Sequence, residues 1–246
     1  MTDRPSSRTH YDRQLAQLGN ELIMLGGTVE HAVARAVEAL RQRDAAAARA
    51  VIIADRAIDD RVYQLEEQAL RLIATQQPLA TDLRVVAATL FIMTELERIG
   101  DYAEGIAKIT LQVAEEAPLK PLIDIPRMAE IVAEMLHDSL SAFIDRDLER
   151  CEAIWLRDDD VDALYDQVFR ELLTYMLANP ATVEPATRLI WAAHNLERIA
   201  DRVTNICERT AFVITGNPRQ LTRRSITDAR ADRSGNYLID PGAAGG

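Results

Sequence analysis

Carboxylates spaced four residues apart are the residues in this chain best suited to bind a cation. Glu97 and Asp101 lie in the segment LERIGD, and Glu197 and Asp201 lie in the matching segment LERIAD, 100 residues later. On a helix, residues four apart share one face and lie about 6 Å from each other. Their carboxylate oxygens are the ligands that hard divalent and trivalent cations prefer. The repeated pairs therefore indicate an internal duplication that carries two candidate metal sites.

A second carboxylate pair precedes each of these motifs. Asp55 and Asp59 precede the first, and Asp158 and Asp162 precede the second. Asp55 and Asp158 each interrupt a row of otherwise apolar residues at heptad spacing, where a carboxylate is unexpected. A side chain of this type at such a position favours a binding role over simple solvation.

The sequence positions of the two kinds of pair predict that they lie close together in the folded chain. Asp59 and Glu97 are each 19 residues from Pro78, and Asp55 and Asp101 are each 23 residues from it. In an antiparallel helical hairpin with its turn at this proline, residues at equal distances from the turn lie level, on axes about 8–10 Å apart. The second half has the same symmetry about its own Asn-Pro turn. The predicted metal ligands are Asp55, Asp59, Glu97 and Asp101 in the first half, and Asp158, Asp162, Glu197 and Asp201 in the second.

Four crowded carboxylates are unfavourable unless a positive charge neutralises them. A divalent or trivalent ion such as Fe, Mn or Mg would do so with its preferred ligand type. The alternative is a metal-free helical scaffold, in which Arg56, Arg98 and Arg157 pair with the carboxylates. A ferritin-like di-iron oxidase is a further alternative, because Glu134 and His137 match one Glu-x-x-His motif, but that site needs two such motifs and two more Glu.

The elements that position these residues are predicted to be helices throughout. Apolar residues recur at alternating spacings of three and four, for example at Leu15, Leu18, Leu22 and Leu25, as expected for the buried stripe of a bundle helix. The fold class is predicted to be all-α, with six long helices in two tandem three-helix bundles. Asp44 is the expected N-cap of the second helix. The predicted divisions are a loose N-terminus (1–8), a first three-helix repeat (9–117), a Pro-rich linker (118–126), a second three-helix repeat (127–216) and a disordered tail (217–246).

Composition narrows the class of partner. The chain has 246 residues, 48% of them apolar, and a formal net charge of −11. An acidic protein of this kind is a poor ligand for nucleic acid or an anionic membrane, and no apolar run is long enough for direct membrane insertion. Two isolated cysteines, Cys151 and Cys207, fit a reducing cytoplasm rather than a disulfide framework. We found no nucleophile–base pair and no phosphate-binding glycine loop in the sequence.

The motifs QPLATDLR, LERIGD and NLERIAD, at their positions in this chain, resemble those of the PhoU family of phosphate-transport regulators. The resemblance covers about residues 10–216. It implies two three-helix bundles, a cytoplasmic location, assembly into a homodimer, and metal sites at the eight carboxylates named above. It also implies a non-catalytic role with two partners, the ATPase-driven phosphate ABC transporter and the phosphate-sensing histidine kinase. That role is negative regulation of phosphate uptake and of phosphate-starvation signalling.

Two features depart from the family pattern. Gly105 stands where the family often has Asn, although Asn205 is present in the second half. The segment 82–84 has no counterpart in the second half, where Glu184 and Pro185 stand instead. The two predicted sites are therefore expected to differ in affinity or occupancy.

Overall fold

The computed structural model describes residues 4–217 and Leu221, with side chains from His10 onward. The described residues form six α-helices and one short 3-10 turn, and they contain no β-strand. The elements are α1 (Arg4–Gln42), α2 (Ala45–Gln76), α3 (Thr81–Val113), α4 (Asp124–Asp145), α5 (Leu148–Ala178), η1 (Pro180–Thr182) and α6 (Val183–Thr215). The all-α prediction is confirmed.

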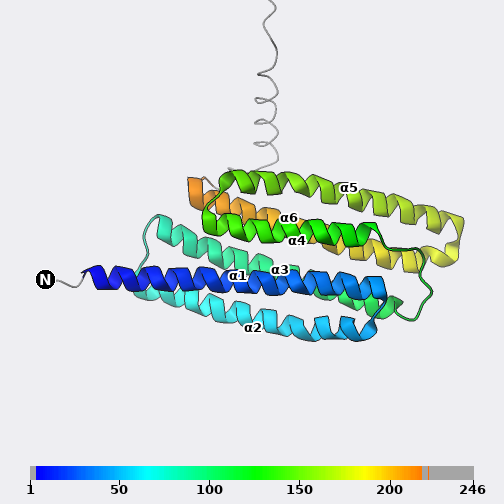
Figure 1. The fold of residues 1–246 in the computed structure, drawn as a ribbon, viewed down its shortest axis with the longest axis horizontal. Helices are drawn as coiled ribbons and strands as arrows, with labels where there is room; N and C mark the ends of the chain where they lie inside the picture. The colour runs from blue at the N-terminus through cyan, green and yellow to red at the C-terminus, as the bar shows by residue number, and fades with distance from the viewer. Residues whose placement is uncertain (1–3, 218–220, 222–246) are drawn as a thin grey trace, which may run out of the picture.

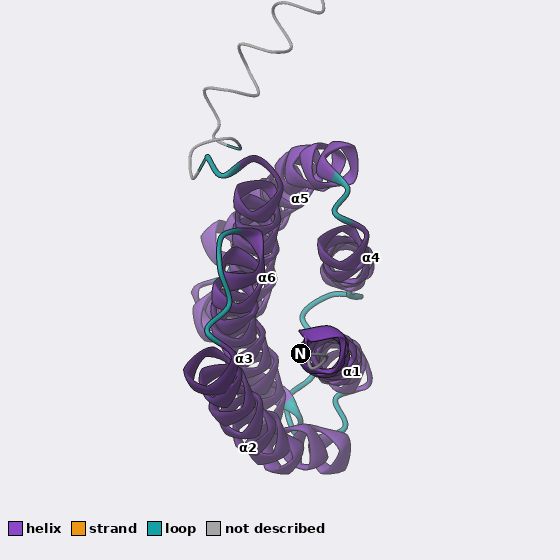
Figure 2. Ribbon diagram, turned by 90° about the vertical axis from the view of Figure 1, so that its left-hand side faces the viewer, coloured by secondary structure: helices purple, strands orange, loops and turns teal. Residues whose placement is uncertain are grey.

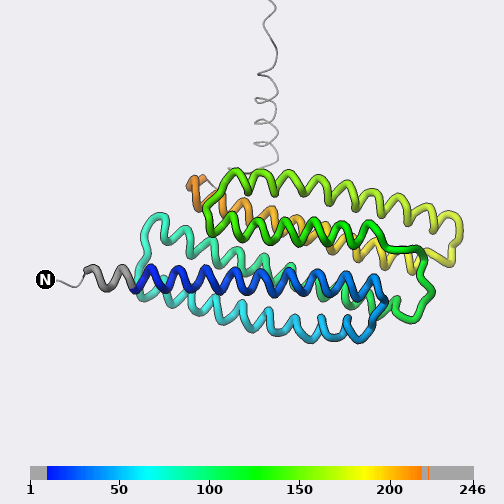
Figure 3. Tube along the Cα trace, in the orientation of Figure 1, coloured from blue at the N-terminus to red at the C-terminus, as the bar shows by residue number. Residues whose placement is uncertain are grey.

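The helices form two layers (Figure 2). α2, α3, α6 and α5 lie side by side in one layer, and α1 and α4 pack together across one face of it. Helices α1–α3 and α4–α6 are the two tandem three-helix bundles that the sequence predicts (Figure 1). The turns of the α2–α3 and α5–α6 hairpins lie at opposite ends of the molecule (Figure 3), so α3 and α6 run antiparallel at the centre.

Burial follows the predicted helical stripes. On α3 the side chains of Ile92, Leu96, Ile99 and Ile106 are fully shielded from solvent. The buried residues of all six helices belong to one continuous hydrophobic cluster, so the two bundles share a core. Each fully buried Leu or Ile contributes about 1.5–3 kcal/mol to folding, which makes this shared core the main constraint on how the two hairpins are placed.

The helix ends have recognisable caps. The Asp44 carboxylate accepts hydrogen bonds from the backbone N–H groups of Ala46 and Ala47 at 2.8 and 2.9 Å, as its position predicts. Asp147 caps α5 in the same way through the N–H of Arg150, at 3.0 Å. The two halves therefore begin their hairpins with the same device.

Some boundaries differ from those predicted. α1 begins at Arg4, so residues 4–8 continue the helix instead of forming a loose end. α4 begins at Asp124 and takes Pro126 into its first turn, where a proline is tolerated because the N–H it lacks has no helical partner. The linker is consequently the non-helical stretch 114–123. Apart from Asn217 and the buried Leu221, the tail predicted to be disordered lies outside the described residues. No helix in the described part of the chain is long and apolar enough to cross a membrane.

Candidate metal centres

The α2–α3 hairpin gathers the four predicted ligands of the first half into one electrostatic cluster. The pKa of Asp55 is raised to about 6, chiefly by burial. Repulsion from Asp59, Glu104 and Asp101 contributes to the same shift. Burial, followed by the charges of Asp59 and Asp101, also raises the pKa of Glu97. The pKa of Asp101 is raised by burial and then by Asp59. Carboxylates of α2 and α3 therefore lie close enough to raise one another's pKa values, as the symmetry about Pro78 predicts.

Asp55 fits into this hairpin because α3 has a glycine opposite it. A Cβ atom on Gly100 would lie 3.0 Å from the Asp55 Oδ1 and 3.3 Å from the Ile58 Cδ1. The missing side chain thus allows the Asp55 carboxylate to approach the α3 backbone within the otherwise apolar interface. At the corresponding position of the second half stands Ala200, which is fully buried.

Among the described residues, the first cluster makes no ion pair, although the charges of Arg98 and Lys108 partly oppose the rise of its pKa values. Within the described residues, no Lys, Arg or His nitrogen lies within ion-pairing distance of its four predicted ligands. Arg56 and Arg98, the suggested neutralising residues, are both exposed, and in the described part of the chain neither forms an ion pair with these carboxylates. The charge of Arg98 nevertheless opposes the rise in the pKa values of Glu97 and Asp101. Glu104, which the sequence prediction missed, lies near the cluster and pairs with Lys108. Its position three residues after Asp101, on the same helical face, was the available signal.

The second cluster is arranged differently. Asp158 is 9% exposed, the most deeply buried of the eight predicted ligands. Asp158 and Asp162 each have an interaction partner. Burial raises the pKa of Glu197, and the charges of Asp201 and Asp162 raise it further, whereas Arg198 and His194 oppose the shift. Asp162 on α5 and Glu197 on α6 therefore lie close together, as predicted for residues level in the hairpin.

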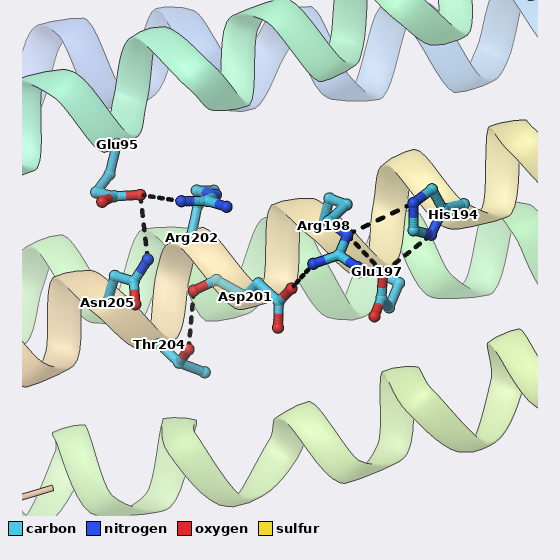
Figure 4. A network of polar contacts seen from close by, with 8 residues as sticks. All are labelled: Glu95, His194, Glu197, Arg198, Asp201, Arg202, Thr204 and Asn205. Atoms are coloured by element: carbon cyan, nitrogen blue, oxygen red, sulfur yellow. Dashed lines mark hydrogen bonds and ion pairs between the residues drawn. The ribbon is translucent and has the colours of Figure 1, made fainter. Parts of the chain in front are cut away.

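Arg198 lies between the two α6 carboxylates of this second cluster, Glu197 and Asp201 (Figure 4). Its Nη1 donates a hydrogen bond to the Asp201 Oδ2 at 3.0 Å, and its Nε lies 3.4 Å from the Glu197 Oε2. The Nδ1 of His194 lies 3.2 Å from the same Glu197 oxygen. This oxygen is shielded from water, and neither nitrogen has hydrogen-bond geometry toward it. Glu197 is thus compensated by nearby charge but retains an unused acceptor.

The side chains do not form a finished metal site. In the part of the chain that the structure describes, no three His, Cys, Asp or Glu side chains are placed so that they could hold a metal ion. The donor set nevertheless suits a hard cation in both halves, since it consists of carboxylates. Burial and repulsion between carboxylates raise the pKa values of Asp55, Glu97 and Asp101 in the first half and of Glu197 in the second. Coordination would require these side chains to rotate toward a common point, and in the second half it would also require Arg198 to move away.

The residues behind the di-iron alternative are engaged elsewhere. Glu134 accepts a hydrogen bond from the Arg157 Nη2 at 2.6 Å, and the Nδ1 of His137 lies 3.6 Å from Glu30. Arg157 therefore neutralises Glu134 on α4 through this contact. These contacts do not assemble the ligand set of a ferritin-like centre.

We call the line of contact between α3 and α6 the seam. It explains why Gly105 stands where the family often has Asn. Glu95 on α3 accepts a hydrogen bond from the Asn205 amide at 3.3 Å and lies 3.5 Å from Arg202 (Figure 4). The equivalent contact across the pseudo-twofold axis is that of Asn195, whose amide would lie 3.3 Å from a Cβ on Gly105. Gly105 thus makes room for Asn195 at the helix crossing. The seam was missed because it joins the two halves, whereas the sequence argument paired helices only within each half.

Fold and clusters together define a class of duplicated all-helical proteins with an acidic hairpin in each half. The chain belongs to the PhoU family, because the family's PhoU domain matches it twice, at residues 22–110 and 125–210.

Known proteins agree with this assignment. The chain is 42% identical over 207 residues to a phosphate-specific transport system accessory protein PhoU homolog of Caulobacter vibrioides, covering 84% of this chain and 90% of the relative. A homolog with the same description from Clostridium acetobutylicum is 38% identical, over 85% of this chain and 96% of the relative. The crystal structure of PhoU from Pseudomonas aeruginosa superimposes with a TM-score of 0.80 at 31% identity, covering 84% of this chain and all of that one.

Proposed function

We propose that this chain is a non-enzymatic cytoplasmic regulator of phosphate homeostasis that acts as an accessory protein of phosphate transport. The observation that carries the proposal is the double match to the PhoU domain, together with relatives described as accessory proteins of the phosphate-specific transport system. The duplicated helical body supports the proposal, since it offers long helix faces for protein contacts.

Two partners are proposed, the ATPase of the phosphate ABC transporter and the phosphate-sensing histidine kinase. Through them the chain would restrain phosphate uptake and the phosphate-starvation response when phosphate is plentiful. The chain is further proposed to act as a homodimer.

Each acidic hairpin is proposed to hold an Fe, Mn or Mg ion. The ligands would be Asp55, Asp59, Glu97 and Asp101 in the first half, and Asp158, Asp162, Glu197 and Asp201 in the second. The support is electrostatic, because raised pKa values mark carboxylates for which a nearby cation would be favourable. Such an ion would fix the two helices of its hairpin and stabilise the folded state by mass action.

A metal-free scaffold is the second candidate, and one observation favours it in the second half. There Arg198 already contacts both Glu197 and Asp201. No comparable contact exists among the described residues around the first cluster, so the metal proposal is stronger for that half.

The regulatory role is tested by deleting the gene in its own host and measuring phosphate uptake and the expression of starvation-induced genes in phosphate-rich medium. We expect both to rise and to return to normal when the intact chain is supplied. A deletion strain with unchanged uptake and unchanged expression would contradict the proposal. Affinity capture from the same cells should recover the transporter ATPase and the kinase.

The metal part is tested separately by elemental analysis of gently purified protein. The double variant Glu97→Ala/Asp101→Ala should lose the metal of the first half while its helical circular dichroism stays nearly unchanged. The matched variant Glu197→Ala/Asp201→Ala reports on the second half. Metal content that is the same in the wild type and both variants would exclude these carboxylates as ligands.

A further inference from the structure

A cavity at one end of the molecule lies apart from both acidic clusters. It is formed where the end of α1, the end of α3, the linker between the halves and the start of α6 meet (Figure 1). Its volume is about 370 Å³, within the range of about 300–1,000 Å³ typical of small-molecule sites. Nine of its thirteen lining residues are apolar, and Pro118, Pro121 and Pro185 stiffen its wall.

Four charged side chains line this cavity, and three of them are already paired. Arg41 bonds Glu38 at 2.6 Å, Lys120 pairs with Glu171, and Glu116 pairs with Arg188. The Lys120 side chain is 9% exposed, whereas its partner Glu171 is 37% exposed. These pairs leave the remaining charged group, Arg43, to decide what the cavity attracts.

The Arg43 guanidinium has no acidic partner among the described residues. Its Nη2 donates a hydrogen bond to the Val113 carbonyl at the end of α3, where helix carbonyls have no helical partner. Its Nε is shielded from water and has no hydrogen-bond partner. The guanidinium therefore retains a full positive charge beside an apolar cavity, an arrangement that complements an anionic group attached to an apolar body.

We propose that this cavity binds a small amphipathic anion, a linear carboxylate of medium chain length, with its head toward Arg43 and its apolar chain against Leu119 and Leu189. Inorganic phosphate does not suit the cavity, because it would leave the apolar wall exposed to water. The ligand would contact both halves and the linker that joins them. This site is independent of the proposed phosphate-related role and of the acidic clusters.

The probe is octanoate, added to the full chain and followed by isothermal titration calorimetry and ligand-observed NMR. We expect saturable binding of one octanoate per chain and binding of hexanoate roughly fifteenfold weaker, because hexanoate lacks two CH₂ groups and each buried CH₂ contributes roughly a factor of four. Octanol, which lacks the charge, and inorganic phosphate, which lacks the chain, should each bind far more weakly. Equal binding of octanol or of phosphate would overturn the proposal, as would the absence of octanoate binding.

Three variants locate the site. Arg43→Met should weaken octanoate binding at least tenfold, whereas Arg146→Met, at the equivalent exposed turn of the second half, should leave it unchanged. Because Arg43 also holds the Val113 carbonyl, Ala117→Trp provides a second test that keeps the arginine and fills the cavity. Loss of binding in Ala117→Trp with unchanged circular dichroism supports the site. Wild-type binding in both Arg43→Met and Ala117→Trp rules it out.

Discussion

The two acidic hairpins share a backbone plan but differ in how their charge is balanced. Arg98 and Arg198 occupy the same place in the two LERI motifs, yet within the described residues only Arg198 makes ion pairs with the carboxylates of its cluster. The two halves also differ in the residue four positions before this arginine. His194 lies 3.5 Å from the Arg198 Nε, whereas its counterpart Thr94 turns its hydroxyl back to the Leu90 carbonyl.

This comparison shows that a shared motif does not fix the state of a site. The LERI segment supplies the same carboxylate and the same guanidinium in both halves, but among the described residues they meet only in the second half, where His194 lies beside the arginine. The first hairpin is consequently the better candidate for a cation, and the second the better candidate for an internal ion pair. Four changes would break or sharpen this contrast.

The largest expected effect on stability comes from changing Gly100 and Ala200, the small residues at corresponding positions of α3 and α6. Ala200→Gly should destabilise the protein by about 2 kcal/mol, because glycine disfavours helix by about 1 kcal/mol and a fully buried methyl is lost. Gly100→Ala should change stability by less than about 1 kcal/mol, since its gain in helix propensity is offset by displacement of Asp55. Urea denaturation of both variants measures the difference, and equal effects would show that Gly100 makes no special room for Asp55.

Removing the central guanidinium should make the second hairpin resemble the first. Arg198→Met is expected to raise the affinity of the second cluster for Mn²⁺ about tenfold, which corresponds to about 1.4 kcal/mol. The matched change Arg98→Met should have a smaller effect, because Arg98 makes no ion pair with its cluster. Cation titrations of the two variants compare them directly. An equal gain in both would mean that the contacts of Arg198 do not govern cation affinity.

The ionisation of Asp55 should make the stability of the folded protein depend on pH. Its folded-state pKa of about 6 exceeds the ordinary value of 3.8, so the folded state binds more protons between these values. Asp55 therefore destabilises the metal-free fold fully above pH 6, and this penalty disappears below about pH 4. After allowance for solvent screening, Asp55→Asn should stabilise the protein by about 1 kcal/mol at pH 8.

The control for this measurement is Asp60→Asn, since Asp60 is exposed on the same helix. Thermal unfolding in the presence of a chelator, from pH 4 to pH 8, follows both variants. A stability difference for Asp55→Asn that stays constant across this range would contradict the assigned pKa.

The smallest effect is expected at the seam between α3 and α6. A double-mutant cycle of Glu95→Ala and Asn205→Ala should give a coupling energy of about 0.5–1 kcal/mol, as expected for one part-buried hydrogen bond. Asn195→Ala combined with Glu95→Ala should show no coupling, because Asn195 faces Gly105 instead. Coupling in the second cycle would contradict the described seam.

Much of the scaffold could be predicted because it depends on local spacing. The apolar stripes, the Asp44 cap and the symmetry of the carboxylates about Pro78 are properties of single helices or single hairpins, and sequence numbering records them directly. The raised pKa values of Asp55 and Glu97 agree with that symmetry.

The features that the sequence did not predict depend on contacts between distant segments. The packing of α1 and α4 across one four-helix layer arises from burial shared by all six helices. The different behaviour of Arg98 and Arg198 depends on side-chain conformation, which spacing does not encode. The role of Gly105 became visible only when α6 placed Asn195 beside it.

The central claim is that a folded-back helix pair in each half holds a hard cation, more tightly in the first half than in the second. Electron paramagnetic resonance titration of metal-free protein with Mn²⁺ tests this most directly. The account predicts two classes of site, with the tighter class removed by Glu97→Ala/Asp101→Ala and the weaker class by Glu197→Ala/Asp201→Ala. No bound Mn²⁺, or a binding curve that neither variant alters, would contradict it.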